Sequence, residues 1–466
     1  MRILLVSPIK ETVGGLGEAP PLGLGYLATA LRREGNEVTI LDCVNKKFTF
    51  KLFENYISQN SFELIGITVY SAALKEVERS LKIIKKISSE TITIVGGPHP
   101  SAAPEHTLSF LKEADFAFRG EGEINFPIFV KLLQAGQKGN FKDVPGLVWR
   151  EAGKIMCNDM DIHQEVDDFD FPAWDLIRPN EYGEPGSIVP KGWTSIIASR
   201  GCPYYCTFCS AHIIAGHRMR YRSVDRVIQE IKYLYLRYGI KKFSILDENF
   251  TLNRMRVTEF CQKILKESVR FEFMLPNGVR LDTLTEDLLE LMKRAGFSKR
   301  MAVGIESGSE RILKMIKKNL TKDEVREKIE LMNRAGFQSI GYFILGFPTE
   351  TRREMQETID FAMSLKLYRA AFTPLILLPG TEIFDTLVKN RELPIDFDFG
   401  KLSTDRVNYA PEGMSREELD RIRRRAILRF HLRLKVILNF MQDYSSLTFA
   451  AKKFANLFLK SASSRM

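Results

Sequence analysis

Apolar runs alternate with helical patterns over residues 1 to about 155. The expected strands cover Ile3 to Val6, Val38 to Leu41, Leu64 to Val69 and Ile92 to Val95, and the expected helices cover Leu22 to Glu34, Phe50 to Gln59, Leu74 to Ile87 and Glu123 to Ala135. Strands that alternate with helices predict an α/β domain with a doubly wound, Rossmann-like parallel sheet. Ligands of such sheets bind beyond the carboxyl ends of the strands.

The strand-then-helix alternation repeats six times from Thr194 onward. Strands are expected at Ser195 to Ala198, Phe243 to Leu246, Phe271 to Met274, Met301 to Ile305, Ser339 to Leu345 and Ala371 to Leu375, with helices at Val224 to Tyr238, Arg254 to Lys266, Glu286 to Ala295, Lys322 to Ala335 and Glu350 to Leu365. Six units are too few to close an eight-stranded barrel. The pattern therefore predicts an open, partial (β/α)6 barrel, with its site at the carboxyl ends of the strands.

The predicted sheet domain covers residues 1–155 and the predicted barrel covers residues 194–400. Two further segments, residues 156–193 and 401–466, complete the chain. The first of these is a linker, because it carries little periodicity and many turn formers. The last is a helical tail with an apolar stripe made of Ile422, Ala426, Ile427, Phe430, Leu434, Ile437 and Met441, and a second stripe made of Leu447, Ala450, Ala451, Phe454, Leu457 and Phe458. Residues 421–460 are compatible with a basic amphipathic helix on a membrane surface and, equally, with helices docked on the barrel.

The net charge of +10 lies in this tail. From Arg421 to Met466 there are eleven Lys and Arg residues against the single acid Asp443, so the rest of the chain is neutral overall. This distribution argues against a nucleic-acid partner for the whole protein. The first residues lack a charged-then-apolar leader, and no apolar run approaches the roughly 20 residues of a bilayer span. We therefore expect a cytoplasmic protein, peripheral to the membrane if the tail binds there.

Three cysteines with C-x₃-C-x₂-C spacing, Cys202, Cys206 and Cys209, lie in one short stretch. Thiolates hold iron–sulfur clusters, and a four-iron cubane needs four ligands, so three cysteines leave one iron open to a substrate. A zinc knuckle, with His212 as the fourth ligand, and a disulfide loop are the alternatives. Zinc sites recur as paired C-x₂-C units, which favours the cluster.

The cysteine spacing, with Phe208 directly before the third cysteine, resembles the signature of the radical S-adenosylmethionine (SAM) superfamily. Three strings of the first domain resemble those of its cobalamin-dependent members: residues 21–28 (PLGLGYLA), 95–100 (VGGPHP) and 119–123 (RGEGE). The D-x-H-x-x-G motif of other cobalamin enzymes would fall at residues 42–47, where the His and the Gly are missing. The resemblance thus implies cobalt without a histidine ligand, or a domain that has lost cobalamin.

The resemblance implies a role for each candidate site residue. Cys202, Cys206 and Cys209 would hold a [4Fe–4S] cluster; Phe208, Asp247, Glu248 and Glu306 would bind SAM; Thr68, Tyr70, Gly96, Gly97 and Glu121 would bind cobalamin. Phe208 would lie near the adenine, the two acids after the second barrel strand near the amino group, and Glu306 near the ribose. It also implies an external one-electron reductant of the flavodoxin or ferredoxin type.

The activity that follows is reductive cleavage of SAM to a 5′-deoxyadenosyl radical, which abstracts hydrogen and needs no general base. With cobalamin, this predicts methylation of an unactivated carbon in a hydrophobic or lipid-like small molecule. Cobalamin-dependent oxidative cyclisation or carbon–carbon coupling is an alternative, as is a redox sensor or binding module without turnover. A tRNA methylthiotransferase would need a further N-terminal cysteine trio, and only Cys43 and Cys157 precede the motif.

Overall fold

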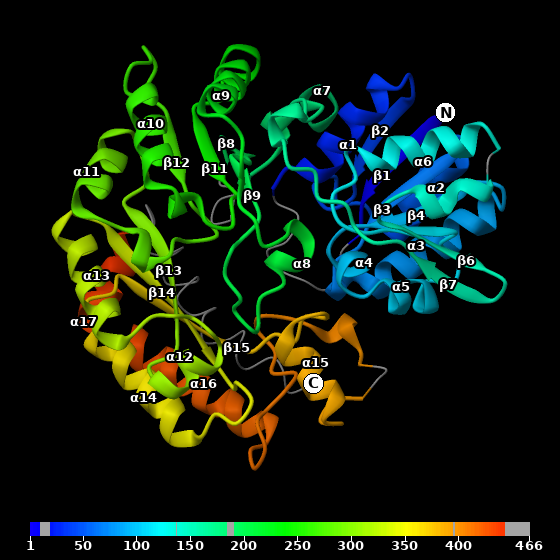
Figure 1. Cartoon of the computed structure of the whole chain (residues 1–466). Coiled ribbons are helices and arrows are strands. Elements are labelled where there is room, and N and C mark those ends of the chain that lie inside the picture. The colour runs from blue at the N-terminus through cyan, green and yellow to red at the C-terminus, as the bar shows by residue number, and fades with distance from the viewer. Residues whose placement is uncertain (10–18, 137, 184–190, 395–396, 443–466) are drawn as a thin grey trace.

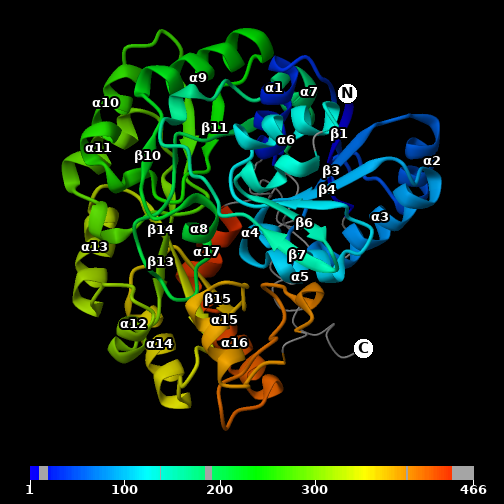
Figure 2. The ribbon, with the colours of Figure 1, turned by 45° about the vertical axis from the view of Figure 1, so that its right-hand side comes forward.

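The computed structural model describes residues 1–9, 19–136, 138–183, 191–394 and 397–442. It consists of a sheet domain and an open barrel that lie side by side, with a linker passing between them. Figure 1 shows the sheet domain in blue to cyan and the barrel in green to yellow, and Figure 2 keeps the same arrangement after the turn.

The sheet domain contains seven strands in the order β2-β1-β3-β4-β5-β6-β7. They are β1 (Arg2–Ser7), β2 (Glu37–Asp42), β3 (Leu64–Thr68), β4 (Ile92–Gly96), β5 (Phe116–Phe118), β6 (Leu147–Glu151) and β7 (Lys154–Cys157). The first five run parallel, and β6 and β7 are antiparallel additions at one edge. The predicted doubly wound sheet is confirmed, and the short strands β5 to β7 are additions to the prediction.

Helices cover both faces of this sheet. They are α1 (Leu22–Arg33), α2 (Phe50–Gln59), α3 (Leu74–Ile87), α4 (Pro98–Ala102), α5 (Pro104–Phe110) and α6 (Asn125–Gln134). Alternate residues of β1 point to opposite faces, so Ile3 and Leu5 join one core with α1 and α6, while Leu4 and Val6 join a second core with α2, α3 and α5. This two-sided burial explains why β1 is a continuous apolar run.

The linker packs between the two halves through specific contacts. In α7 (Trp174–Ile177), the indole N–H of the buried Trp174 donates to Glu230 of the barrel at 3.0 Å. The Tyr182 hydroxyl donates to Asp42 of the sheet domain at 2.9 Å. A Cβ on Gly25 would lie 2.5 Å from Ile177, so glycine is required there for α1 to approach the linker this closely.

Two three-stranded parallel sheets form the barrel, in the orders β12-β11-β8 and β13-β14-β15. The strands are β8 (Trp193–Ile196), β11 (Lys242–Ile245), β12 (Glu272–Met274), β13 (Arg300–Glu306), β14 (Gln338–Leu345) and β15 (Arg369–Pro374). Single bridges from Phe273 to Phe297 and from Val279 to Val303 join the two sheets. The predicted six-stranded open barrel is confirmed.

The helices of the barrel lie outside its strands (Figure 1). They are α9 (Val224–Tyr238), α10 (Arg254–Ile264), α11 (Glu286–Arg294), α12 (Glu310–Met315), α13 (Lys322–Arg334) and α14 (Arg352–Ser364). The next helix, α15 (Glu382–Lys389), instead faces the sheet domain, where its buried Ile383 and Leu387 share a core with η7. After α15 the chain returns to the sheet domain, where η7 (Phe399–Lys401) packs beside η1 (Ser71–Ala73) and α3. Lys75 and Asp398 form an ion pair at 2.9 Å across this contact.

Two helices, α16 (Arg416–His431) and α17 (Leu434–Gln442), follow η7. The predicted apolar stripe of α16 faces the protein, because Ala426 and Phe430 are buried and the helix packs against β15. The α16 part of this stripe is therefore covered by the barrel, which is the docked alternative, whereas Leu434 of the same stripe, in α17, is 73% exposed. The second predicted stripe lies outside the described residues, as do all residues of the 421–460 segment after Gln442. Among the described helices, none has the length and apolar character that crossing a bilayer requires.

Candidate active site between the sheet domain and the barrel

The cysteine loop follows β9 (Ser199–Arg200), at the carboxyl side of β8. Backbone hydrogen bonds fix both of its sides: Cys202 N–H donates to Gly216 at 3.1 Å, and Thr207 N–H donates to Ile316 at 3.2 Å. Gly201 has a φ of +94°, and a Cβ there would lie 2.3 Å from the carbonyl oxygen of Arg218. The loop thus depends on a glycine immediately before its first cysteine.

The three cysteines of the loop are free and half-buried, and they are near enough to influence one another. Burial, followed by the charges of Cys206 and Cys202, raises the pKa of Cys209 to about 11. A zinc ion needs its ligands within about 2.3 Å of one point. Within the described ranges, no group of three or more His, Cys, Asp or Glu side chains could hold one metal ion. The three thiols share one short loop, and the positive charge of an iron–sulfur core would stabilise them as thiolates.

Asp247 and Glu248 leave the carboxyl end of β11 in different directions. The Asp247 carboxylate accepts from Ala198 N–H at 2.7 Å and from the Ser199 hydroxyl at 2.5 Å, which joins β11 to β8. Glu248 instead lines the cavity described below, and burial raises its pKa to about 7. Glu248 is therefore the acid of this pair that a cationic ligand group could reach.

Glu306 ends β13 in a left-handed conformation, with a φ of +69°. Its carboxylate pairs with Lys318 Nζ at 2.9 Å, and both side chains are about nine-tenths buried. Gly304 leaves room for this pair, because a Cβ there would lie 2.4 Å from Glu306 Oε1 and 2.9 Å from Lys318 Nζ. Sequence reasoning missed Lys318, which the loop after α12 brings back to the end of β13.

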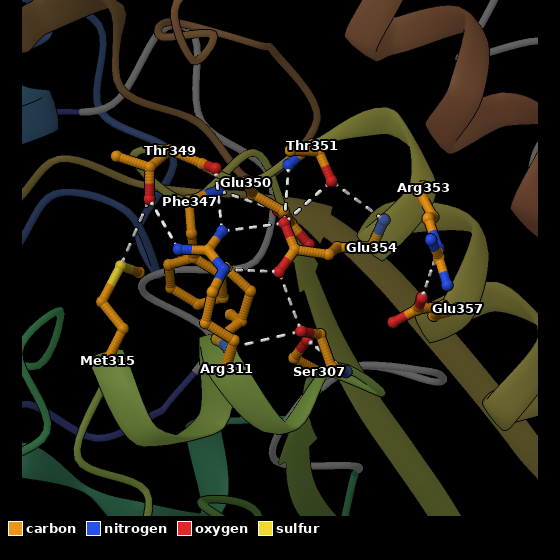
Figure 3. Close-up of polar contacts among 12 residues, drawn as sticks. Ser307, Arg311, Met315, Phe347, Thr349, Glu350, Thr351, Arg353, Glu354 and Glu357 are labelled. Atoms are coloured by element: carbon orange, nitrogen blue, oxygen red, sulfur yellow. Dashed lines mark hydrogen bonds and ion pairs between the residues drawn. The ribbon is translucent and has the colours of Figure 1, made fainter.

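Phe208 contacts the turn after β14, where its ring lies 5.7 Å from that of Phe347. Figure 3 shows how this turn is held. Glu350 accepts from the N–H groups of Gly346 and Phe347 at 2.7 and 3.0 Å. Arg311 donates to Glu354 at 2.7 and 2.8 Å, and Glu354 also caps α14 through Thr351.

The predicted cobalamin residues gather at the carboxyl ends of the parallel strands. Thr68, Tyr70, Gly96, Gly97 and Glu121 all line one cavity of about 560 Å³. Gly97 has a φ of +101° and packs on Thr68, where a Cβ would approach to 3.0 Å. Arg200 and Glu248 of the barrel line the same cavity. A glycine-lined floor between the two domains suits a large, flat ligand such as cobalamin.

Asp42, at the position of the absent D-x-H-x-x-G motif, is committed to local structure. Its carboxylate accepts from the N–H groups of Val44 and Asn45 at 3.1 and 3.2 Å and from the Tyr182 hydroxyl. It is buried, and burial raises its pKa. This arrangement fits a cobalamin that takes no histidine from this segment.

Glu121 has partners that sequence reasoning did not foresee. Arg220, with a side chain only 1% exposed, binds both Glu121 oxygens at 2.7 Å, and Arg200 lies 3.2 Å from the same carboxylate. Arg200 also pairs with Glu123 at 2.7 Å. We name Glu121, Glu123, Arg200 and Arg220 the interdomain bridge, since it ties the RGEGE loop to the residue two positions before Cys202.

Comparison with family models identifies two regions of this chain. Residues 12–130 match the B12 binding domain, and residues 196–362 match the Radical SAM superfamily. The first region falls in the sheet domain and the second in the barrel. The cavity between the domains therefore lies between the two matched regions.

Individual proteins resemble the chain over most of its length. An uncharacterized methyltransferase of Pyrococcus horikoshii is 34% identical, with 94% of each chain covered. An anaerobic magnesium-protoporphyrin IX monomethyl ester cyclase of Rubrivivax gelatinosus is 26% identical over 91% of this chain and 76% of its own. The radical SAM methyltransferase TsrM of Kitasatospora setae, solved with cobalamin and a [4Fe–4S] cluster bound, shares the fold with a TM-score of 0.68 at 19% identity, over 84% of this chain and 75% of its own.

Proposed function

This chain belongs to the cobalamin-dependent radical SAM enzyme family, and we propose that it methylates an unactivated carbon of a hydrophobic substrate. The observation that carries the proposal is the shared cavity. Thr68 and Gly97 of the sheet domain line it together with Arg200 and Glu248 of the barrel. A methyl carrier on one side and a radical source on the other would both reach a substrate held there.

The cofactors of this family are a [4Fe–4S] cluster, SAM and cobalamin. When bound, the cluster supplies the electron that splits the SAM sulfonium, and cobalamin supplies the group transfer. In this chain, Cys202, Cys206 and Cys209 would hold the cluster. Cobalamin would lie on the glycine-lined floor formed by residues that include Thr68, Tyr70, Gly96 and Gly97.

The barrel residues would orient SAM and keep water away from it. Glu248 would accept hydrogen bonds from the SAM amino group. Asp247, through its bonds to Ala198 and Ser199, would hold the end of β11 in place beside the segment that follows β8. The Glu306 carboxylate, which the ion pair with Lys318 holds in place, would accept hydrogen bonds from the ribose hydroxyls of SAM. Phe208, backed by Phe347, would cover one side of the adenine.

Apolar residues on the barrel side of the cavity support a hydrophobic substrate. Ile197, Ile214 and Leu246 line it there. Removing water from this surface would protect a carbon radical from side reactions. Substrate binding would therefore draw mainly on apolar contact, with few polar groups to fix its orientation.

Oxidative cyclisation is a second candidate activity, because a relative that covers most of this chain is named a cyclase. Both activities would use the same cluster and SAM residues. They differ in whether a methyl group of SAM appears in the product.

The proposal is tested by anaerobic incubation of reconstituted protein with methyl-labelled SAM, dithionite and hydrophobic extracts. We expect 5′-deoxyadenosine from the parent protein and from Cys157→Ala, which changes an exposed cysteine outside the loop, and only background from Cys206→Ala. Label in an extracted product favours methylation, and an unlabelled product favours cyclisation. Absence of 5′-deoxyadenosine from the parent, with the cluster present, contradicts both activities.

A further inference from the structure

Two walls of the cavity are joined by one buried histidine. The first wall is the turn after β4, with Gly96 and Gly97, and the second is the segment that contains η1, of which Tyr70 and Ala72 line the cavity. His99, in α4, is 0% exposed and does not line the cavity itself. We propose that His99 is a positioning residue, which holds the two walls at a fixed distance and so prepares the cavity for cobalamin. This inference rests on the proposed function, because it takes cobalamin as the ligand of the cavity.

The contacts of His99 run from one wall to the other. Its backbone N–H donates to the carbonyl of Val69 at 3.1 Å, and the Val69 N–H donates to the carbonyl of Gly96 at 2.7 Å. The Nδ1 atom of His99 also forms a hydrogen bond of 2.9 Å with the hydroxyl of Ser71, in η1. Backbone bonds therefore hold the ends of β3 and β4 together, and the bond to Ser71 extends this connection to η1.

A second histidine and a phenylalanine hold the other side of the His99 ring. Its Nε2 atom lies 3.1 Å from Nδ1 of His106, in α5, and the ring of Phe399, in η7, lies 5.1 Å from each of the two histidine rings. Burial, followed by His106, lowers the pKa of His99 to about 3, so the ring is neutral at physiological pH. A neutral imidazole donates from one nitrogen and accepts at the other, so His99 can make both hydrogen bonds at once. Turning the ring would leave a buried nitrogen without a partner.

A fixed distance between the walls matters because η1 has little capacity to adapt. Ala72 and Ala73 line the cavity with side chains that have no rotamers, so the position of the η1 backbone sets the shape of this wall. Without the bond from Ser71, η1 would have to be ordered when the ligand binds. A ligand binds more tightly when its site is already in place, since the ordering cost has been met during folding.

The two nitrogens of His99 can be tested separately. An Asn side chain places its amide near the position of Nδ1, and a Gln side chain places it near that of Nε2. His99→Asn therefore keeps the bond to Ser71 and loses the one to His106, and His99→Gln does the reverse. Ser71→Ala removes the same bond as His99→Gln. His431→Gln is the matched control, because His431 is also buried, at 5% exposed, but its Nδ1 donates to the carbonyl of Ile427 in α16.

The experiment measures the dissociation constant of hydroxocobalamin by visible absorbance, on full-length protein that carries its cluster. Urea unfolding of the same proteins records their stability. We expect the dissociation constant to rise about threefold to tenfold in His99→Gln and Ser71→Ala, and to change by less than about twofold in His99→Asn and His431→Gln. The three histidine variants should all be less stable than the parent, so a loss of stability does not explain the difference in affinity.

Equal dissociation constants in all five proteins overturn the positioning role. An equal rise in His99→Asn and His99→Gln, with Ser71→Ala unchanged, also overturns it, since the histidine would then support the fold without setting the wall. If the parent itself does not bind hydroxocobalamin, the proposed function is wrong and the inference fails with it.

Discussion

Glu350 shows how a single buried carboxylate affects this site. It is 2% exposed, its Oε2 atom accepts two backbone N–H groups, and its Oε1 atom has no hydrogen-bond partner within the described residues. Burial outweighs the two hydrogen bonds and raises its pKa to about 7. The turn that carries Phe347 is thus held by a group that prefers to keep its proton.

We predict that Glu350 makes the protein less stable as the pH rises. Between about pH 4.5 and 7 the unfolded chain loses this proton while the folded protein retains it, so the free energy of unfolding falls by about 3 kcal/mol across that window. Glu350→Gln keeps an acceptor for the two N–H groups and cannot ionise. Urea unfolding should show equal stability of the two proteins at pH 4 and a more stable Gln variant at pH 8.5. Glu327→Gln changes an exposed glutamate of α13 and should have the same stability as the parent at both pH values. If the stability of Glu350→Gln changes with pH in the same way as that of the parent, Glu350 is not the source of the pH dependence.

Individual side chains were the hardest feature to infer from the sequence. Asp247 and Glu248 are adjacent acids after the same strand. Only the fold reveals that the Asp247 carboxylate already accepts hydrogen bonds from the Ser199 hydroxyl and the Ala198 N–H. Lys318 reaches Glu306 because the short helix α12 turns the chain back, which no periodicity records. The cysteine loop could be predicted from the sequence, because its three cysteines are close together and their spacing is specific to iron–sulfur cluster binding.

Helices and strands with strong periodicity were predicted closely, since their burial follows from local pattern. The expected helices over residues 50–59, 74–87 and 224–238 coincide with α2, α3 and α9. In contrast, β5 has three residues, too few for a recognisable alternation, and the edge pair β6–β7 depends on neighbours distant in sequence. The orientation of α16 was likewise open, because a basic amphipathic helix can face either a membrane or a protein core.

The docking of α16 leads to a stability prediction. Phe430 is fully buried and its ring lies 6.3 Å from that of Phe372 on β15, so Phe430→Ala should lower the free energy of unfolding by about 3 to 5 kcal/mol. Leu428→Ala removes a 40% exposed leucine of the same helix and should cost less than about 1 kcal/mol. Chemical denaturation of both variants provides the comparison. Similar small losses in the two would mean that the helix is not docked as described.

The two halves of the molecule are joined by charges that are almost completely removed from water. Arg220 is 1% exposed, and its guanidinium donates to Glu121 and to the carbonyl groups of His163 and Ala215. It therefore connects the sheet domain, the linker and the segment after the cysteine loop. A buried ion pair of this kind contributes less than its contacts suggest, but losing one partner leaves the other charge uncompensated.

We predict that Glu121→Gln costs about 3 to 5 kcal/mol in the free energy of unfolding. It should also weaken cobalamin binding several-fold, measured by the change in visible absorbance on titration, because Glu121 lines the cavity. Glu37→Gln is the matched control, since it breaks the exposed pair with Arg2 and should cost less than about 1 kcal/mol. If Glu121→Gln lowers the stability but leaves the cobalamin affinity unchanged, the interdomain bridge contributes to folding and not to cobalamin binding.

The contact between Lys75 and Asp398, which are 323 positions apart, has a consequence for the order of synthesis. The sheet domain emerges from the ribosome first and can fold while the barrel is still being made. Until the chain has been extended past Leu402, nothing of η7 exists to cover η1 and His99, which Phe399 contacts in the finished protein. The nascent first domain therefore has one uncovered surface, and it stays uncovered until the segment that contains η7 has been translated.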